Sequence, residues 1–538
     1  MAIYLQNGII FDGLGSPPKT GGIFLDGDRI LEFRDTAPPV ENLEVIDCSG
    51  LWVMPGLIDA HSHNDFLALH CDSEHFFRPF LMQGITTFVT GNCGYSASGF
   101  APDSPFANEI GGAIFPPNDQ TDQHGNFAVW LAAVEQRACA NIASLTGHGS
   151  ARTGENGQGS TPLTAESLEQ MLFQLEEALK AGALGVSLGL MYEPGIFASM
   201  EELLQVARLV KKYDRILTVH PKAESNVSMA YPLLGRSHLL RALDELAFIV
   251  RETGVRFEYS HLIFVGRRTW PDVPAALKIL EDLKSEGYDV GFDIYSLNYG
   301  ASVITVLLPE WYMKLSTKKR LAPWTRFKLW AMTGITETML GFGFPDITIS
   351  YAGEDHRDWI GKTIPDLAKQ WGCSNFHAYI RACDESHFQA AVLQDGYQNL
   401  DIMQKLMQHP LSLYMTDAWV TAHGKQNGAI YGTFPMFLEQ ARDIGFPIEQ
   451  AVAKMTGLTA QRFQMKDRGE LRPGAYADIT IVDPATLQNR IAEELPPLGI
   501  PYVFVNGQAV VYNGEYRPGQ NAGQVIRVNT NAAAAPAV

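Results

Sequence analysis

Residues 55–63 read PGLIDAHSH, a Pro-Gly turn and a short apolar run that ends in two histidines. Side chains two residues apart in a β-strand lie on one face, so His61 and His63 are expected to point in the same direction. Two neutral imidazoles at this spacing can bind one metal ion. The stretch therefore predicts a strand whose carboxyl end carries metal ligands.

Similar apolar runs recur through the middle of the chain, separated by amphipathic helical stretches. The runs lie at 84–89, 142–146, 184–189, 216–219, 256–259, 289–294 and 411–415, with helical stretches at 165–179, 200–212 and 273–283. Such alternation indicates an α/β fold with a parallel sheet, and about eight units of this kind fit a (β/α)8 TIM barrel. A Rossmann sheet is disfavoured because no GxGxxG motif follows the first strand.

The two ends of the chain differ from the middle. Short runs bounded by Gly, Asp and Asn predict a small β-sandwich domain formed by both termini, residues 1–55 plus 470–525, beside a barrel at 56–469. Residues 301–408 break the alternation and are rich in Trp and Lys, so they are expected to form a helical insertion. Residues 526–538 are expected to be a mobile tail.

Composition limits the class of protein. The chain has 538 residues, 46% of them hydrophobic, and a formal net charge of −18, which disfavours nucleic-acid and anionic-membrane partners. No signal-peptide pattern and no long apolar run are seen, and the six cysteines form no CxxC pair. These features predict a cytoplasmic protein, and they are compatible with a homo-oligomer.

Cys93 lies in the sequence GNCG, directly after the run 84–89. A lone cysteine is most commonly a small buried thiol. The flanking glycines and asparagine favour instead a tight loop that presents sulfur at the carboxyl end of a strand, where a thiolate suits zinc.

Three further residues, His220, His261 and Asp417, each end a strand-like run. A single histidine in such a place is more often structural than a ligand. Together with the residues above, they lie where TIM barrels build their active sites. His148 follows the run 142–146 and is expected to line the same pocket.

Several longer segments resemble the amidohydrolase superfamily and, within it, the N-acyl-D-amino-acid deacylases (D-aminoacylases). The matching segments are PGLIDAHSHND (55–65), GITTFVTGNCG (84–94), TGHGSAR (146–152), GALGVSLGLMYEP (182–194), YGTFP (431–435), KMTGLTAQRF (454–463) and RGELRPGAYADITIVDP (468–484). The resemblance runs nearly end to end, and it implies an enzyme that hydrolyses a carbon–nitrogen amide bond in a small N-acyl or amide substrate.

The resemblance also implies roles for individual residues. Cys93, His220 and His261 match a tight zinc site, and His61 and His63 match a second, weaker metal position that Cys93 can bridge. Asp417 matches the catalytic aspartate, and Tyr192 and Tyr295 match tyrosines near the substrate. Zinc would activate a water molecule, Asp417 would act as general base and then general acid, and Tyr192 or a backbone N–H would support the oxyanion.

The sequence departs from the family at positions that bind the substrate carboxylate. Ile263 stands where the family has a lysine, and Ala429 stands where an arginine is usual. Loss of a buried carboxylate contact costs about 2–5 kcal/mol. The substrate is therefore expected to be a neutral or more apolar amide, unless Lys222, Arg267 or Arg268 supplies the missing cation.

Three alternatives remain at this stage. A cyclic amide or imide hydrolase of the hydantoinase kind normally has a metal-bridging lysine and lacks the cysteine of GNCG. Metal-dependent C–C cleavage occurs on the same scaffold, and release of an amine would distinguish hydrolysis from it. A non-catalytic scaffold is disfavoured because all six metal and acid positions are present.

Overall fold

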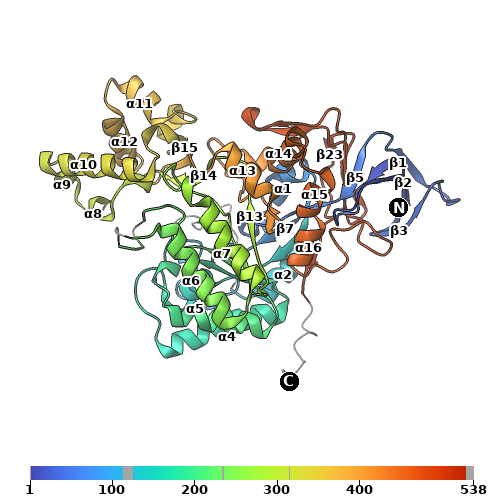
Figure 1. Cartoon of the computed structure of the whole chain (residues 1–538), viewed down its shortest axis with the longest axis horizontal. Coiled ribbons are helices and arrows are strands. Elements are labelled where there is room, and N and C mark those ends of the chain that lie inside the picture. The colour runs from blue at the N-terminus through green and yellow to red at the C-terminus, as the bar shows by residue number, and fades with distance from the viewer. Residues whose placement is uncertain are drawn as a thin grey trace.

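A computed structural model describes residues 2–112, 115, 125–228, 230–232, 235–313 and 315–528 (Figure 1). The chain has an α/β fold with a separate β domain. The central strands are parallel and lie in two sheets, ordered β6-β7-β8-β24 and β9-β10-β11-β12-β13-β17. Their bounds are β6 Leu57–Asp59, β7 Ile85–Thr90, β8 Asn141–Ser144, β9 Thr146–Gly147, β10 Gly185–Gly189, β11 Ile216–His220, β12 Arg256–Tyr259, β13 Val290–Ile294, β17 Ser412–Tyr414 and β24 Val525–Ile526.

The predicted alternation of strands and helices is confirmed. The helices between these strands are α1 Ser73–Leu81, α2 Phe127–Glu135, α3 His148–Asn156, α4 Ala165–Ala181, α5 Met200–Lys212, α6 His238–Thr253, α7 Val273–Ser285 and α13 Leu400–Gln408, and α14 Ala429–Ile444, α15 Ile448–Lys454 and α16 Gly457–Arg462 follow β17. Strands β7 (ITTFVT), β8 (NIAS) and β10 (GVSLG) are buried at every residue, their Thr, Asn and Ser residues included. Strands of a parallel sheet are commonly covered on both faces.

Local sequence fixes several helix ends. The Ser199 side chain accepts a hydrogen bond from Glu202 N at the start of α5, and the Thr164 side chain caps α4 in the same way. Helix α4 ends at Gly182, which has φ +109, a left-handed conformation that glycine adopts without strain.

The β domain is built from strands near both termini. Its strands are β1 Ile3–Ile10, β2 Lys19–Asp26, β3 Arg29–Arg34, β4 Glu44–Asp47, β5 Trp52–Pro55, β18 Ile479–Val482, β21 Tyr502–Val505, β22 Gln508–Tyr512 and β23 Glu515–Tyr516. They pair as one continuous sheet around a separate apolar core. A short hairpin, β19 Gln488–Arg490 and β20 Leu495–Leu498, lies against α14.

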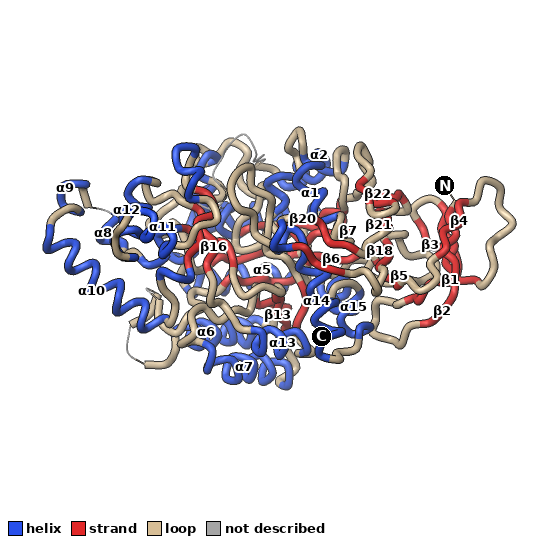
Figure 2. Tube along the Cα trace, turned by 90° about the horizontal axis from the view of Figure 1, so that it is seen from above, coloured by secondary structure: helices blue, strands red, loops and turns tan. Residues whose placement is uncertain are grey.

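The predicted helical insertion is partly wrong. It contains the helices α8 Glu310–Met313, α9 Thr317–Arg320, α10 Pro323–Leu340, α11 Ile364–Trp371 and α12 Asn375–Glu385, but also the antiparallel sheet β14 Gly300–Val303, β16 Ala391–Gln394 and β15 Ile347–Tyr351. The lobe has an apolar core of its own, and it projects from the end of the molecule opposite the β domain (Figures 1 and 2). The lobe ends at β16, because α13 packs against β17 of the central sheet.

The predicted tail also begins too early. Val525 and Ile526 pair with β8, and Val528 N donates to the carbonyl of Gly182, so residues 526–528 are held against the central sheet. Residues 529–538 lie outside the described part of the chain. Among the residues that are described, no helix is long and apolar enough to cross a membrane.

Candidate metal centre

The residues predicted to bind metal come together at the carboxyl ends of the central strands. His61 and His63 follow β6, Cys93 follows β7, and His220 is the last residue of β11. His261 follows β12 and Asp417 follows β17. Parallel strands place these ends at one edge of the sheet, which is how residues more than 300 positions apart meet.

Cys93 and His261 lie at the middle of the cluster. Cys93 Sγ is 3.2 Å from His61 Nε2 and 3.4 Å from His261 Nε2. His261 Nε2 is in turn 2.8 Å from His220 Nδ1. The predicted tight-site residues thus form a contiguous group, and His61 joins it through the sulfur.

A second group lies beside the first and shares His61 with it. Asp417 Oδ1 is 3.5 Å from His61 Nε2 and 3.4 Å from His63 Nε2. His61, His63 and Asp417 therefore have ligand atoms within 4.8 Å of one another, as do His61, Cys93 and His261. His220, Glu224 and His261 form a third group of this kind, so the cluster contains overlapping sets of possible metal ligands.

Three of these residues have an unusual backbone conformation. Cys93 has φ +53, His261 +38 and Asp417 +48, a left-handed region that side-chain-bearing residues seldom adopt. Gly91 precedes Cys93 with φ +73, and a Cβ there would lie 2.3 Å from the Leu145 carbonyl oxygen. The turns at these ligands keep a backbone conformation that is unfavourable for residues other than glycine, and such conformations are common at functional sites.

Three buried carboxylates surround the ligands, and the sequence analysis did not identify them. Asp293 Oδ2 is 3.4 Å from His61 Nδ1, and Asp293 Oδ1 accepts a 2.5 Å hydrogen bond from His261 N. Asp59 accepts hydrogen bonds from His61 N and from the Thr416 backbone and hydroxyl. A carboxylate beside a ring nitrogen, as Asp293 is beside His61 Nδ1, fixes the orientation of a metal-binding imidazole.

The third carboxylate is Glu224, four residues after His220. Its Oε1 lies 2.6 Å from His261 Nδ1. In the sequence, Glu224 and Asp293 are acidic residues in or near apolar strands. This position alone does not indicate which groups their side chains contact.

Electrostatics favour an anionic sulfur at this place. Burial opposes ionisation of Cys93, but the neighbouring His61 and His261 and hydrogen bonds from His220 and His261 hold its pKa well below the ordinary value. Burial tends to lower the pKa of His61, yet Cys93 and Asp293 raise it well above the usual range. The pocket thus stabilises a negative charge on Cys93 together with positive charge on the neighbouring histidines. A metal-binding thiolate is typically found in such an environment.

Burial raises the pKa of Asp417, but the hydrogen bond from His63 and the charges of His61 and His261 outweigh burial and lower it. Asp417 is consequently ionised near neutral pH and can accept a proton.

The predicted substrate-binding residues are distributed unevenly. Tyr192 is near the cluster: its hydroxyl donates to the Cys93 carbonyl at 2.7 Å, and its ring centre is 5.0 Å from that of His220. Tyr295 is buried directly after β13. Ile263, two residues after His261, is also buried, and so is Ala429 at the start of α14.

Two predicted residues are engaged elsewhere. His148 Nε2 bonds the Glu202 carboxylate at 2.8 Å, and Arg152 bonds the same oxygen. Lys222 Nζ pairs with Glu245 at 2.8 Å. No described contact joins either side chain to the metal ligands, so their part in substrate binding stays a prediction.

An aromatic wall stands beside the second group of ligands. The ring centre of Phe115 is 4.9 Å from that of His63 and 4.7 Å from that of Trp419. Trp419 also packs edge-on against His63 at 5.5 Å. Trp419 lies two residues beyond Asp417, so the wall is close to the proposed catalytic carboxylate.

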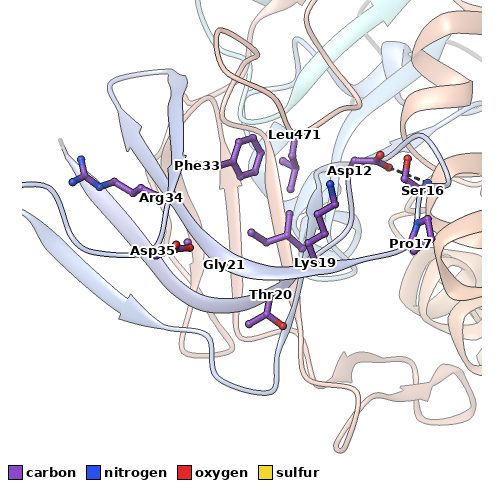
Figure 3. Close-up of a pocket in the computed structure, with 12 residues that line it drawn as sticks. Asp12, Ser16, Pro17, Lys19, Thr20, Gly21, Phe33, Arg34, Asp35 and Leu471 are labelled. Carbon is purple, nitrogen blue, oxygen red and sulfur yellow. Dashed lines mark hydrogen bonds between the residues drawn. The ribbon is translucent and has the colours of Figure 1, made fainter.

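The cavity shown in Figure 3 is separate from this site. It has a volume of about 470 Å³ and lies in the β domain, where residues of β1–β3 and the loop before β2 surround it together with Leu471. It contains neither histidine nor cysteine and shares no residue with the ligand cluster.

The ligand cluster fits a zinc ion. It offers one thiolate, four imidazoles and one carboxylate, the donor types that zinc prefers. Within the described part of the chain, His63 Nδ1 and His220 Nε2 are buried without a hydrogen-bond partner. Buried polar atoms without a partner are unusual unless something else satisfies them.

The chain is similar to known amidohydrolases. A family model described as "Amidohydrolase family" matches residues 362–511. N-acyl-D-glutamate deacylase of Alcaligenes xylosoxydans xylosoxydans is 28% identical over 99% of this chain and 98% of its own length, and D-aminoacylase of the same organism is 28% identical over 97% of each.

Solved structures show the same relationship. One is N-acyl-D-glutamate deacylase from Bordetella bronchiseptica, solved with zinc and a phosphonate inhibitor that mimics the tetrahedral intermediate. It superposes with a TM-score of 0.78 at 28% identity, over 98% of this chain and 99% of that chain. A D-aminoacylase structure gives 0.77 at 27% identity with the same coverage. Residues 362–511 therefore match the amidohydrolase family, and the chain is similar over nearly its full length to the N-acyl-D-amino-acid deacylases.

Proposed function

We propose that this protein is a zinc-dependent amidohydrolase that cleaves the C–N bond of a small N-acyl or amide substrate. The observation that carries the proposal is the convergence of Cys93, His61 and His261, whose ligand atoms lie within 4.8 Å of one another in a buried pocket. The deacylases that share this chain's length and fold support the reaction class.

The proposal assigns a tight zinc site to Cys93, His220 and His261, and a second, weaker position to His61 and His63. Zinc bound there would supply a Lewis acid that polarises a carbonyl and lowers the pKa of a water molecule to about 7. The buried carboxylates of Asp293 and Glu224 hold the imidazoles of His61 and His261 in place.

We propose that the central strands close into a (β/α)8 barrel and that the β domain lies beside this barrel. In this view β8 and β9 are two parts of one strand interrupted at Leu145, whose N–H donates to the Thr90 carbonyl. A hydrogen bond from Ala60 N to the Tyr414 carbonyl, 3.3 Å long, links the first and last strands. The β domain would comprise residues 1–55 and 470–525, and free cysteines such as exposed Cys71 suit a cytoplasmic setting.

Asp417 is the proposed acid–base residue. Its lowered pKa leaves it ionised, so that it can take a proton from the attacking water and later deliver that proton to the leaving nitrogen. The Asp59 carboxylate holds the backbone of neighbouring Thr416 and thereby fixes the position of Asp417.

Tyr192 is proposed to support the negative charge that develops on the carbonyl oxygen. Burial raises the pKa of its hydroxyl well above the usual value, so the group keeps its proton as a donor. It now donates to the Cys93 carbonyl and would exchange that bond for one to the substrate.

The proposed substrate carries no carboxylate at the position that the related deacylases recognise. Ile263 and Ala429 are buried and apolar, and Lys222 is paired with Glu245. Phe115 and Trp419 add an aromatic surface beside His63. A neutral aryl or alkyl amide would bury apolar area here without leaving a charge unpaired.

A comparison of substrates tests this proposal. Purified protein loaded with zinc would be assayed for amine release from N-acetyl-D-amino acids and from neutral aryl amides. Turnover of the neutral amides with little activity on the D-amino-acid derivatives is expected. Robust deacetylation of N-acetyl-D-amino acids would refute the neutral-substrate assignment, and carbon–carbon cleavage without amine release would refute amide hydrolysis.

A further inference from the structure

The insertion lobe carries an exposed aromatic face on α10. Trp324 is 73% exposed, Phe327 55% and Trp330 57%, with Leu321 and Ile335 exposed to a similar extent. The rings line up along the helix: Trp324 and Phe327 have centres 5.7 Å apart, and Phe327 and Trp330 are 6.0 Å apart. We call Trp324, Phe327 and Trp330 the α10 aromatic face.

The aromatic face is not needed for the core of the lobe. The buried residues of α10 are Leu329, Thr333 and Leu340, which lie on the opposite side of the helix. A contiguous exposed apolar patch costs solubility, and in natural proteins such patches mark sites of interaction.

Positive charge surrounds this face. From residue 311 to residue 336 the sequence contains six Lys and Arg residues and no Asp or Glu, although the whole chain has a net charge of −18. Arg320 and Arg326 pair with Asp384 of α12. Lys318 and Lys319 are exposed on α9, and Lys328 is exposed on α10 with its Nζ 4.4 Å over the Trp311 ring.

The position of the helix suits contact with a large flat partner. In two views at right angles, α9 and α10 lie at the end of the molecule opposite β1–β3 (Figures 1 and 2). A surface that meets α10 from outside would not meet the β domain at the same time.

We propose that α9 and α10 dock the protein onto an anionic lipid surface. Helices that lie in the membrane interface combine Trp, Phe and Leu on one side with Lys and Arg around them, and they bind through buried apolar area together with attraction to anionic lipid. Tryptophan is also the aromatic residue that favours the headgroup region. The proposed hydrolysis is not required for this docking.

A second copy of the chain fits the face less well. Two copies of α10 packed across a two-fold axis would bring Lys328 and its neighbours on α9 close to their equivalents, and like charges in an interface are unfavourable. Anionic headgroups complement the same lysines.

Net charge alone gave the opposite expectation, that no membrane partner exists. The charge is unevenly distributed: the whole chain has 41 Lys and Arg residues and 59 Asp and Glu, whereas residues 317–340, which span α9 and α10, have five Lys and Arg residues and one acidic residue, Glu337. At physiological salt, charges further than roughly 8 Å from a lipid surface are largely screened. Whether the lobe is attracted to the surface therefore depends on the basic residues near α10 rather than on the net charge of the chain.

Vesicle flotation with the full-length protein tests the proposal. Phosphatidylcholine vesicles with and without about one third phosphatidylserine would be compared. Wild-type protein is expected to float with the anionic vesicles and to be released at high salt. Lys318→Glu with Lys319→Glu should weaken binding at least about tenfold, and Trp324→Ala, Phe327→Ala and Trp330→Ala together should abolish it.

The matched control is Phe173→Ala with Phe248→Ala, which removes exposed aromatic side chains from α4 and α6 and should leave flotation unchanged. Thermal unfolding and amide hydrolysis in solution confirm that each variant is folded, because none of these residues is in the metal centre. Failure of folded wild-type protein to bind anionic vesicles would overturn the proposal, as would equal binding by the triple variant. Concentration-dependent dimerisation that the triple variant loses, without vesicle binding, would assign the face to a second copy instead.

Discussion

Glu224 Oε1 lies 2.6 Å from His261 Nδ1, although the two residues follow different strands of the central sheet. His261 thereby has one ring nitrogen beside a carboxylate and the other beside the Cys93 sulfur and His220. A carboxylate in this place fixes the ring and makes it a stronger metal ligand.

Replacing Glu224 with glutamine should therefore weaken zinc binding. The expected loss of metal affinity is about 10- to 100-fold, because the charge that supports His261 is removed while its shape is kept. Competition with a chelator measures the affinity. Glu245→Gln is the matched control, since Glu245 pairs with Lys222 and not with a ligand. Equal affinities for the two variants would show that Glu224 does not support the site.

Asp417→Asn should separate metal binding from proton transfer. We expect kcat to fall by about 10²–10⁴-fold, because the amide cannot accept a proton from water. Metal analysis should still find zinc at the site formed by Cys93, His220 and His261. Retained activity in this variant would place the acid–base function on another residue.

Ile263→Lys should place a cation where the resemblance to the deacylases predicts one. The ratio of kcat/KM for N-acetyl-D-glutamate to that for a neutral amide is expected to rise by at least about tenfold, because the buried substrate carboxylate gains a partner. Ile263→Met, which keeps the site apolar, should leave the ratio unchanged. A ratio that does not respond to the lysine would mean that Ile263 does not face the substrate.

Lys454 should make stability depend on pH. Burial lowers its pKa to about 7, and within the described residues its Nζ donates to uncharged oxygens of Ser412 and His409. Between pH 7 and the ordinary lysine pKa, the unfolded chain binds a proton that the folded chain does not. The free energy of unfolding should therefore rise with pH in this window, by up to about 1.4 kcal/mol per unit from this group.

Lys454→Met removes the titrating group and should flatten that rise. Denaturant unfolding of both proteins at several pH values from neutral upward measures the difference in slope. Parallel curves would show that Lys454 is charged in the folded state.

Much of the site could be predicted from local sequence. The two-residue spacing of His61 and His63 and the GNCG loop around Cys93 each specify a geometry that depends only on neighbouring residues. The contacts of Asp293 and Glu224 could not be predicted, because they depend on which loop end meets which ring in space.

The insertion shows the same limit. Strand β16 pairs with β14 and β15, which lie about 90 and 40 residues earlier in the chain, and such non-local pairing leaves no short-range periodic signal. The helices of the lobe could be predicted from local periodicity, but its sheet could not. The net charge is likewise an average over the chain, and it conceals the six Lys and Arg residues between positions 311 and 336.

The most direct test of the account is the zinc content of purified protein and of Cys93→Ala, measured together with amine release. The account predicts about one zinc or more per wild-type chain, and loss of both the metal and amine release when the thiolate is removed. Zinc that stays bound without Cys93, or wild-type protein that binds none, would contradict the proposed metal centre.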